Sequence, residues 1–218
     1  MQLGADVVLH SGTKYLAGHS DSLIGIVTTS PKTKRGKELA PIVKNVQIAA
    51  GGVASPFDSW LTLRGLRTLH VRIERQCQNA LHMAKYLQSQ HRFVTAVHYP
   101  GLESHPHHNV ACQQTVRQRQ GGKDRGIRFG GVLSFEVVDE AYAMAVAGAL
   151  RIIQRATSLG GTETLIEHRA SIEPIERRTS PPGLLRISAG LEDPDDLIAD
   201  LDNALRIANQ IVVEGRRC

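Results

Sequence analysis

The sequence predicts an α/β chain in two parts, residues 1–90 and 91–218. The first part opens with short apolar runs bounded by Gly, Ser and Pro, and it closes with a long segment whose apolar residues recur every three or four positions. These are the patterns of strands and of an amphipathic helix. After Phe93, short strand patterns alternate with shorter helical patterns, which is typical of a separate α+β unit.

Composition argues against several classes of function. The 218 residues are 41% hydrophobic and 22% charged, which is enough for a packed core. The net charge is +5, but basic residues are interleaved with acidic ones and not with aromatic ones, so we expect no nucleic-acid partner. Apolar stretches are shorter than the roughly 18 residues of a membrane helix, so we expect no membrane association. Three distant cysteines form no disulfide framework, which favours a cytoplasmic location.

The first part begins with two expected strands. Residues 5–9 and 23–29 are short, apolar and rich in β-branched residues, so Lys14 falls on the connection between two strands. Residues 30–41 carry four Lys or Arg with a proline near each end. We expect a solvated turn there.

One long helix is expected to follow. Ser55-Pro56 and Asp58 form a helix start, with a hydroxyl cap, a proline where no N–H is needed and an acid in the first turn. Gly65 marks either a kink or a close packing contact. The apolar stripe, which continues to about Gln88, comprises Leu66, Leu69, Ile73, Cys77, Ala80, Ala84 and Leu87.

The second part predicts strands at 132–138 and 184–188, a helix at 140–150 and a turn at 180–183. Arg186 alternates with Leu185 and Ile187 on its strand, so its side chain faces the opposite side, into a polar cleft or solvent. Asp193-Pro194 opens the last helix. Its apolar face comprises Leu197, Leu201, Leu205, Ala208 and Val212.

Lys14 is the first candidate for chemistry. A loop lysine is most often solvated, but this one lies near a strand end, beside hydroxyls and small residues. Partial desolvation there frees the amine as a nucleophile. Ser11 and Thr13 provide hydroxyls and loop amides that suit a phosphate. The Walker phosphate loop is excluded because its Gly and Lys spacing is absent.

Six sequence segments, distributed over nearly the whole chain, support this interpretation of Lys14. They are "LGADVVLHSGTKYLAGHSD", "SPFDSWLTLRGLRTLHVR", "HYPGLESHP", "FGGVLSFEV", "SLGGTETL" and "LLRISAGLEDPDDLIADLDNAL". In this order they resemble the Cys/Met-metabolism pyridoxal-phosphate enzymes, the group of cystathionine γ-synthase, cystathionine lyases, methionine γ-lyase and homoserine sulfhydrylases. The resemblance implies an aspartate aminotransferase-like fold, fold type I. Residues 1–90 would be the C-terminal part of the cofactor-binding domain with its linking helix, and residues 91–218 the smaller α+β C-terminal domain.

The resemblance also implies residue roles. Lys14 would be the catalytic residue and would hold pyridoxal 5'-phosphate as a Schiff base, while Ser11 and Thr13 would bind the cofactor phosphate. Arg186 would bind the substrate carboxylate through its planar guanidinium, assisted by Ser158. No metal is implied. The resemblance implies a homo-oligomer, a dimer or a tetramer, that acts on a small amino-acid substrate.

The implied reaction is replacement at the γ carbon of a homoserine-derived amino acid. The alternatives are elimination, as in a cystathionine or methionine γ-lyase, and a catalytically incomplete fragment with a structural, partner-dependent role. Thr157 stands where relatives that recognise a distal amine often carry an acid, which favours replacement. Arg169 and Ile172 stand where lyases commonly carry proline and methionine. In this family, further cofactor-binding residues precede the lysine, so we expect this chain alone to bind cofactor weakly.

Other polar residues receive structural interpretations. His105, His107 and His108 lack a second ligand cluster, so we expect a surface loop and no metal site. Cys77 and Cys112 are expected to be core thiols. Arg64 is expected to brace its helix.

Overall fold

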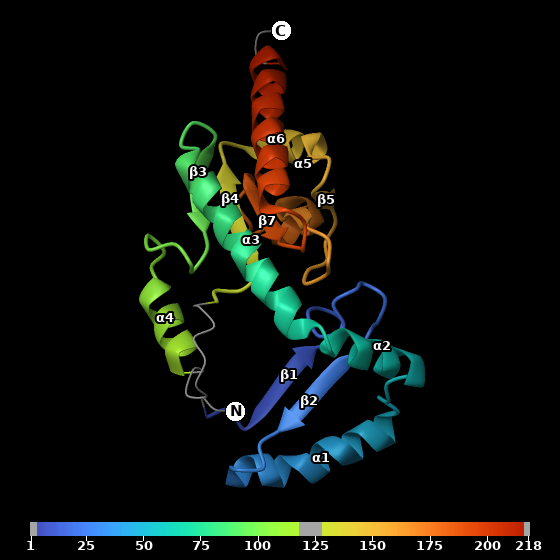
Figure 1. Ribbon diagram of the computed structural model, residues 1–218. Helices are drawn as coiled ribbons and strands as arrows, with labels where there is room; N and C mark the ends of the chain where they lie inside the picture. The colour runs from blue at the N-terminus through green and yellow to red at the C-terminus, as the bar shows by residue number, and fades with distance from the viewer. Residues whose placement is uncertain (1–3, 118–127, 216–218) are drawn as a thin grey trace. The chain divides into compact units, whose positions relative to one another are not determined.

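The computed structural model describes residues 4–117 and 128–215. The chain forms two compact units, Met1–His70 and Val71–Cys218 (Figure 1). The sequence-based domain boundary near residue 90 stays a prediction. Among the described residues, no helix is long and apolar enough to cross a membrane.

The first unit contains a two-stranded ribbon. Strands β1 (Val7–Ser11) and β2 (Gly25–Thr29) pair antiparallel, with Ser11 opposite Gly25. Two strands were predicted here and two are present. The first one begins and ends two residues later than the predicted range 5–9. Because the ribbon extends to Ser11, the Lys14 loop begins directly at the strand end, as predicted.

Helix α1 (Lys34–Ala50) contradicts the predicted solvated turn at residues 30–41. Thr33 caps it, because its Oγ1 accepts a hydrogen bond from Gly36 N at 3.1 Å. Pro41 lies inside the helix. A proline removes one backbone hydrogen bond, but lysine and arginine are good helix formers, and the capped helix continues through it.

The predicted long helix is two helices, α2 (Pro56–Leu66) and α3 (Leu69–Ser89). The start at Ser55-Pro56 is confirmed, because Asp58 N donates to Ser55 Oγ at 3.0 Å. The break follows Gly65, whose Cα packs so closely on the carbonyl of Ala17 that a Cβ would overlap it. Gly65 therefore marks a close packing contact, one of the two predicted alternatives.

The second unit contains a five-stranded sheet in the order β3-β4-β7-β6-β5. The strands are β3 (Val94–His98), β4 (Val132–Val137), β5 (Gln154–Arg155), β6 (Leu165–His168) and β7 (Leu184–Ser188). Neighbouring strands are antiparallel except β5 and β6, which are parallel. The predicted strands at 132–138 and 184–188 are confirmed.

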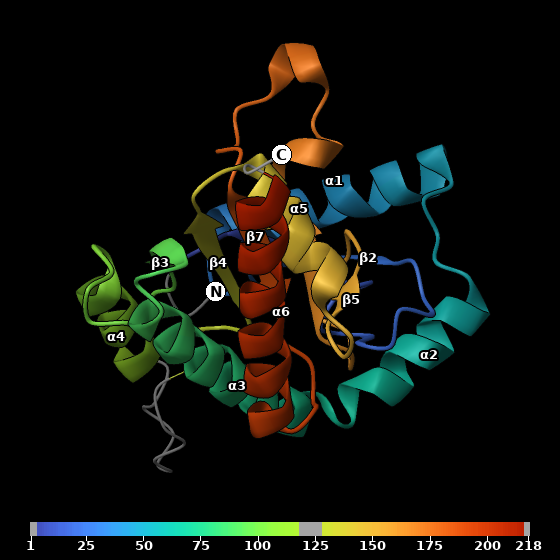
Figure 2. The ribbon, with the colours of Figure 1, turned by 90° about the horizontal axis from the view of Figure 1, so that it is seen from above.

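Helices α3, α5 (Glu140–Ala149) and α6 (Pro194–Gly215) share one core with this sheet. Figure 2 shows α5 and α6 side by side, and Tyr142 Oη donates to Leu205 O between them at 2.8 Å. The predicted apolar face of the last helix is confirmed, since Leu197, Leu201, Leu205 and Ala208 are fully buried. The remaining helices are α4 (His108–Arg117) and the short turns η1 (Ala170–Ile172) and η2 (Ile175–Arg177).

Candidate active site

The Lys14 loop is a tight turn built on the end of the β1–β2 ribbon. Gly12 N and Thr13 N both donate to Ile24 O, at 2.7 and 3.2 Å, so the loop is tied to the residue before β2. Lys14 N donates to Ser11 O at 3.3 Å, and Gly18 N donates back to Lys14 O at 2.7 Å. Backbone hydrogen bonds on both sides of Lys14 therefore determine where its side chain leaves the chain.

Two glycines make this turn possible. Gly12 lies so close to Ile24 that a Cβ would approach Ile24 Cγ2 to 2.6 Å. Gly18 has a φ of 72°, a left-handed conformation that side chains other than glycine adopt at a cost. Lys14 itself is half-buried. The turn is therefore compact, and it leaves the Lys14 side chain partly exposed.

The structure brings the predicted Ser11, Thr13 and Lys14 together on this one turn. Thr13 Oγ1 accepts a hydrogen bond from Ile24 N at 3.0 Å, which leaves the Thr13 hydroxyl hydrogen to donate to a ligand oxygen. Ser11 is exposed at the strand end. Two hydroxyl side chains and one lysine on the same turn are groups that suit the phosphate and the aldehyde of pyridoxal phosphate.

Arg186 lies on β7 between two neighbouring strands, opposite Ser134 of β4 and Glu167 of β6. Leu185 and Ile187 beside it are fully buried, whereas 19% of the Arg186 side chain is exposed. The predicted alternation is therefore confirmed. The arginine projects from the polar face of a central strand and stays partly exposed.

Arg186 and Ser158 are brought together in the second unit. Arg186 Nη2 donates to the carbonyls of Thr157 and Ser158, at 3.0 and 3.2 Å, and it also pairs with Glu167 Oε2. Arg186 Nε, in contrast, is buried and has no hydrogen-bond partner among the described residues. A buried donor without a partner is costly. A bound carboxylate would satisfy it, so the arginine fits its implied role.

The loop that carries Ser158 is held by residues that the sequence analysis did not identify. Gly160 N donates to Ser188 Oγ at 2.9 Å, and Gln76 Nε2 donates to Gly161 O at 2.6 Å. Gln76 lies on α3 and is fully buried. A glutamine within an apolar helical stripe is the signal that could have indicated this contact.

The two groups of predicted residues lie in different units. Ser11, Thr13 and Lys14 belong to Met1–His70, while Ser158 and Arg186 belong to Val71–Cys218. Each group is preorganised within its own unit by backbone hydrogen bonds.

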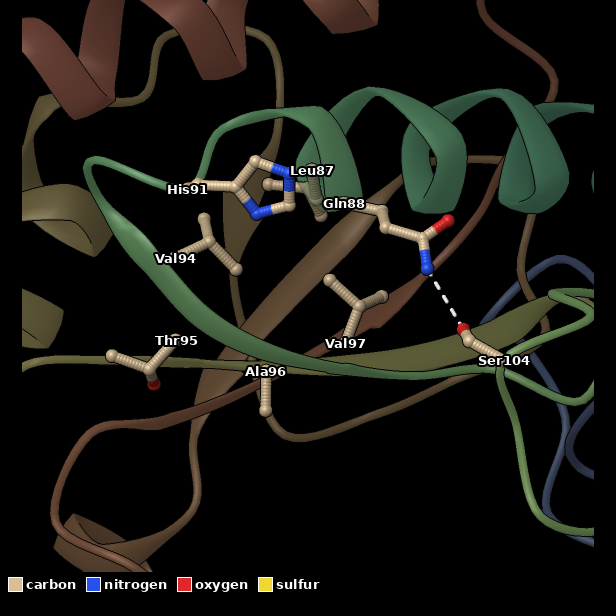
Figure 3. A pocket seen from close by; sticks show the side chains of 8 residues that line it. All are labelled: Leu87, Gln88, His91, Val94, Thr95, Ala96, Val97 and Ser104. Carbon is tan, nitrogen blue, oxygen red and sulfur yellow. Dashed lines mark hydrogen bonds between the residues drawn. The ribbon is translucent and has the colours of Figure 1, made fainter.

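Two small hollows lie elsewhere on the units. One, of about 140 Å³, is in the first unit and is lined by His19, Asp21, Leu61, Arg64, Gly65 and Thr68. The other, of about 190 Å³, lies between the end of α3 and the edge strand β3. Figure 3 shows Gln88 and Ser104 joined at this second hollow by a 2.7 Å hydrogen bond. None of the predicted site residues lines either hollow.

The histidine segment forms no metal site among the described residues. The rings of His105 and His107 lie 5.8 Å apart. The pKa of His105 is lowered, first by desolvation and second by the charges of the neighbouring histidines. The predicted loop is wrong at His108, which begins α4.

Cys77 is buried as predicted, and burial raises the pKa of its thiol. Cys112 is only half-buried, 3.4 Å from His108 Nε2.

The fold places the chain with the fold type I pyridoxal-phosphate enzymes. Its structure is similar to that of cystathionine gamma-lyase from yeast, with a TM-score of 0.82 and 38% identity, over 94% of this chain and 51% of that one. A second similar structure is metB from Corynebacterium glutamicum, with a TM-score of 0.80 and 39% identity, over 94% of this chain and 50% of that one.

A family model described as Cys/Met metabolism PLP-dependent enzyme matches residues 1–206. The chain belongs to this family, and the resemblance inferred from its sequence blocks is confirmed. Relatives include cystathionine gamma-lyase of Bacillus subtilis, 42% identical over 94% of this chain and 52% of the relative. Cystathionine gamma-synthase of Mycobacterium tuberculosis is 40% identical over 94% of this chain and 50% of the relative. The chain spans about half the length of the curated relatives it matches.

Proposed function

We propose that this chain takes part in pyridoxal-phosphate-dependent replacement at the γ carbon of a homoserine-derived amino acid. The observation that carries the proposal is the turn that holds Lys14 half-buried beside the hydroxyls of Ser11 and Thr13. Within this family, a fixed amine beside two hydroxyls suits an aldehyde cofactor that carries a phosphate.

Each residue has a distinct task in this proposal. Lys14 Nζ would hold the cofactor through its aldehyde, and the same amine would move protons between the substrate Cα and Cβ. Ser11 and Thr13 hold the phosphate. Arg186 binds the substrate carboxylate, beside the Ser158 loop that its Nη2 already contacts. The bound cofactor supplies the electron sink that makes loss of these carbon-bound protons feasible.

Replacement is favoured over elimination by Thr157. Its side chain is neutral, and its carbonyl is engaged by Arg186 Nη2 at 3.0 Å, so the position presents no acid to a distal substrate amine. Elimination, as the names of the lyase relatives describe for those proteins, is the alternative reaction of the same site.

The wider organisation is proposed on the same basis. Residues 1–90 form the C-terminal part of the fold type I cofactor-binding domain, and residues 91–218 form the smaller α+β C-terminal domain. The working assembly is a cytoplasmic homo-oligomer, a dimer or a tetramer.

A second candidate is a partner-dependent subunit without turnover of its own. The apolar surface of the first unit favours it. The exposed residues there include Ile42, Val46, Ile48, Trp60 and Leu63, each more than half exposed. Large apolar side chains left exposed in this number suit a surface that another chain covers, and a two-stranded ribbon alone is marginally stable in water.

Borohydride trapping tests the role of Lys14. The purified chain is incubated with pyridoxal phosphate, reduced and mapped by peptide mass spectrometry. We expect the label on Lys14, its loss in Lys14→Ala, and its retention in Lys44→Ala, which removes an exposed α1 lysine. A label on another lysine would contradict the proposal.

A substrate panel then separates the candidate functions. Homoserine esters and thiols are supplied to the same chain, and keto-acid release is compared with thioether formation. Thioether formation supports replacement, and keto-acid release supports elimination. Labelling of Lys14 without either product supports the partner-dependent subunit.

A further inference from the structure

Glu167 is a buried carboxylate shared by two arginines. It lies on β6 directly opposite Arg186 on β7, and only 2% of its side chain is exposed. Its Oε2 forms an ion pair with Arg186 Nη2 but no hydrogen bond among the described residues, while its Oε1 accepts from Arg169 Nη1 at 2.6 Å. Burial of a carboxylate is expensive unless it is paired and hydrogen-bonded, so Glu167 holds both guanidinium groups close to fixed positions.

Arg169 connects this carboxylate to a second one. Its Nη2 lies 3.6 Å from Glu173 Oε1. Glu173 is itself held by three donors: Ser180 Oγ at 2.5 Å, Thr179 N at 2.8 Å and Ser180 N at 3.1 Å. A continuous series of charged contacts therefore runs from the segment before β7 to the guanidinium of Arg186.

These contacts select one orientation of Arg186. Glu167 and the carbonyls of Thr157 and Ser158 all engage the same nitrogen, Nη2. The buried Nε is left without a partner among the described residues. A long arginine side chain has many rotamers, and ordering it costs conformational entropy. Here the folded protein already orders the Arg186 side chain before a ligand binds.

We propose that Glu167 is a positioning residue, held in place by Arg169, that orients Arg186 to receive the carboxylate of an amino-acid substrate. This inference rests on the proposed function, since it takes Arg186 as the carboxylate-binding group. It predicts that the preference for ligands with a carboxylate over ligands without one depends on Glu167, which does not touch the substrate.

The test compares two ligands that differ only in the carboxyl group. Homoserine and 3-aminopropanol, which lacks it, are titrated by calorimetry into the full chain loaded with pyridoxal phosphate. Removal of Glu167 alone would leave buried positive charge uncompensated, so the variant is the charge-balanced Glu167→Gln/Arg169→Gln. We expect it to lose about tenfold of the preference for homoserine, the loss of one well-oriented charged hydrogen bond.

A matched control removes an ion pair of the surface. Glu140 and Arg178 pair at 3.3 Å, with 44% and 30% of their side chains exposed. Glu140→Gln/Arg178→Gln should leave the preference unchanged. Arg186→Gln should abolish it.

A second readout needs no ligand. Phenylglyoxal labelling followed by peptide mapping reports the accessibility of each guanidinium. Arg186 should react several-fold faster in the Glu167→Gln/Arg169→Gln variant than in the wild-type chain, while the exposed Arg206 serves as the internal reference.

The outcomes separate this inference from the proposed function. A wild-type chain that does not prefer homoserine, or an Arg186→Gln variant that keeps the preference, overturns both. A preference that depends on Arg186 but survives the Glu167→Gln/Arg169→Gln change overturns only the positioning role of Glu167. An unchanged labelling rate at Arg186 does the same.

Discussion

Glu192 binds both polar groups of Thr164. Its Oε1 accepts from Thr164 N and its Oε2 from Thr164 Oγ1, each at 2.6 Å. The same Thr164 hydroxyl oxygen accepts a hydrogen bond from Gly190 N at 2.8 Å. This paired contact joins the segment after β7 to the start of β6, and it closes the loop that carries Ser158.

Thr164→Val should destabilise the second unit by about 1–3 kcal/mol, because it leaves the buried Gly190 N–H and a half-buried Glu192 carboxylate oxygen without these partners. Chemical denaturation followed by circular dichroism measures the change. Thr115→Val is the control, since Thr115 is half-buried and its Oγ1 donates to two carbonyls, those of Ala111 at 2.9 Å and Arg128 at 3.4 Å, and not to a carboxylate. An equal loss in both variants would contradict the importance of the Glu192 contact.

Acid should weaken the protein through Glu173. Hydrogen bonds from the Ser180 hydroxyl and the Thr179 and Ser180 amides lower its pKa to about 2, from an ordinary value of 4.5. Because the folded pKa is the lower one, the stabilisation is present above the unfolded pKa and is lost as the pH falls from 4.5 toward 2. Ser180→Ala should therefore be less stable than wild type at neutral pH, with a difference that shrinks across this window.

The control for this pH effect is Ser171→Ala. Ser171 Oγ donates to the carbonyl of His168 at 3.0 Å and not to a carboxylate. Its effect on the free energy of unfolding should stay constant between pH 5 and 2, within about 0.5 kcal/mol. A Ser180→Ala difference that is equally flat would show that Glu173 does not titrate as expected.

Gly65→Ala should destabilise the first unit by about 1–3 kcal/mol, because its Cβ would overlap the carbonyl of Ala17. Trp60, the single tryptophan, lies on the same helix and reports the transition by fluorescence. Gly148→Ala is the opposite case, since in the described part of the chain no atom beyond its neighbours and its own helix backbone lies within 4 Å of the Cβ position on α5. That variant should gain about 0.5–1 kcal/mol.

Asp200→Ala should cost about 3 kcal/mol, because it removes the acceptor of three consecutive backbone N–H groups. Arg151 N, Ile152 N and Ile153 N each donate to the Asp200 carboxylate at 2.9 Å. Thermal unfolding of Asp200→Ala is compared with that of Asp196→Ala, which removes an exposed acid from the first turn of the same helix. The Asp196→Ala change should cost less than about 1 kcal/mol. Similar losses would show that the three hydrogen bonds contribute little.

Local sequence patterns predicted most elements correctly where the signal itself is local. The helix start at Ser55-Pro56 depends on a cap within three residues of itself, and the face of α6 depends on a period within one helix. The prediction was wrong at residues 30–41, because it rested on the charged residues and the two prolines and did not identify the Thr33 cap. It marked Gly65 but not the division into two helices that follows it, and it left the kind of contact open, because the carbonyl of Ala17 that packs there is distant in the sequence.

The sequence by itself determined the family and the group of Ser11, Thr13 and Lys14, because these residues are nearly consecutive and one backbone turn holds them together. It also indicated that Arg186 points away from the core, since alternation along a strand is a local property. Only the tertiary structure decided what surrounds Arg186. Glu167 meets it through the register of β6 and β7, and register depends on how distant strands pack, which no single stretch of sequence specifies.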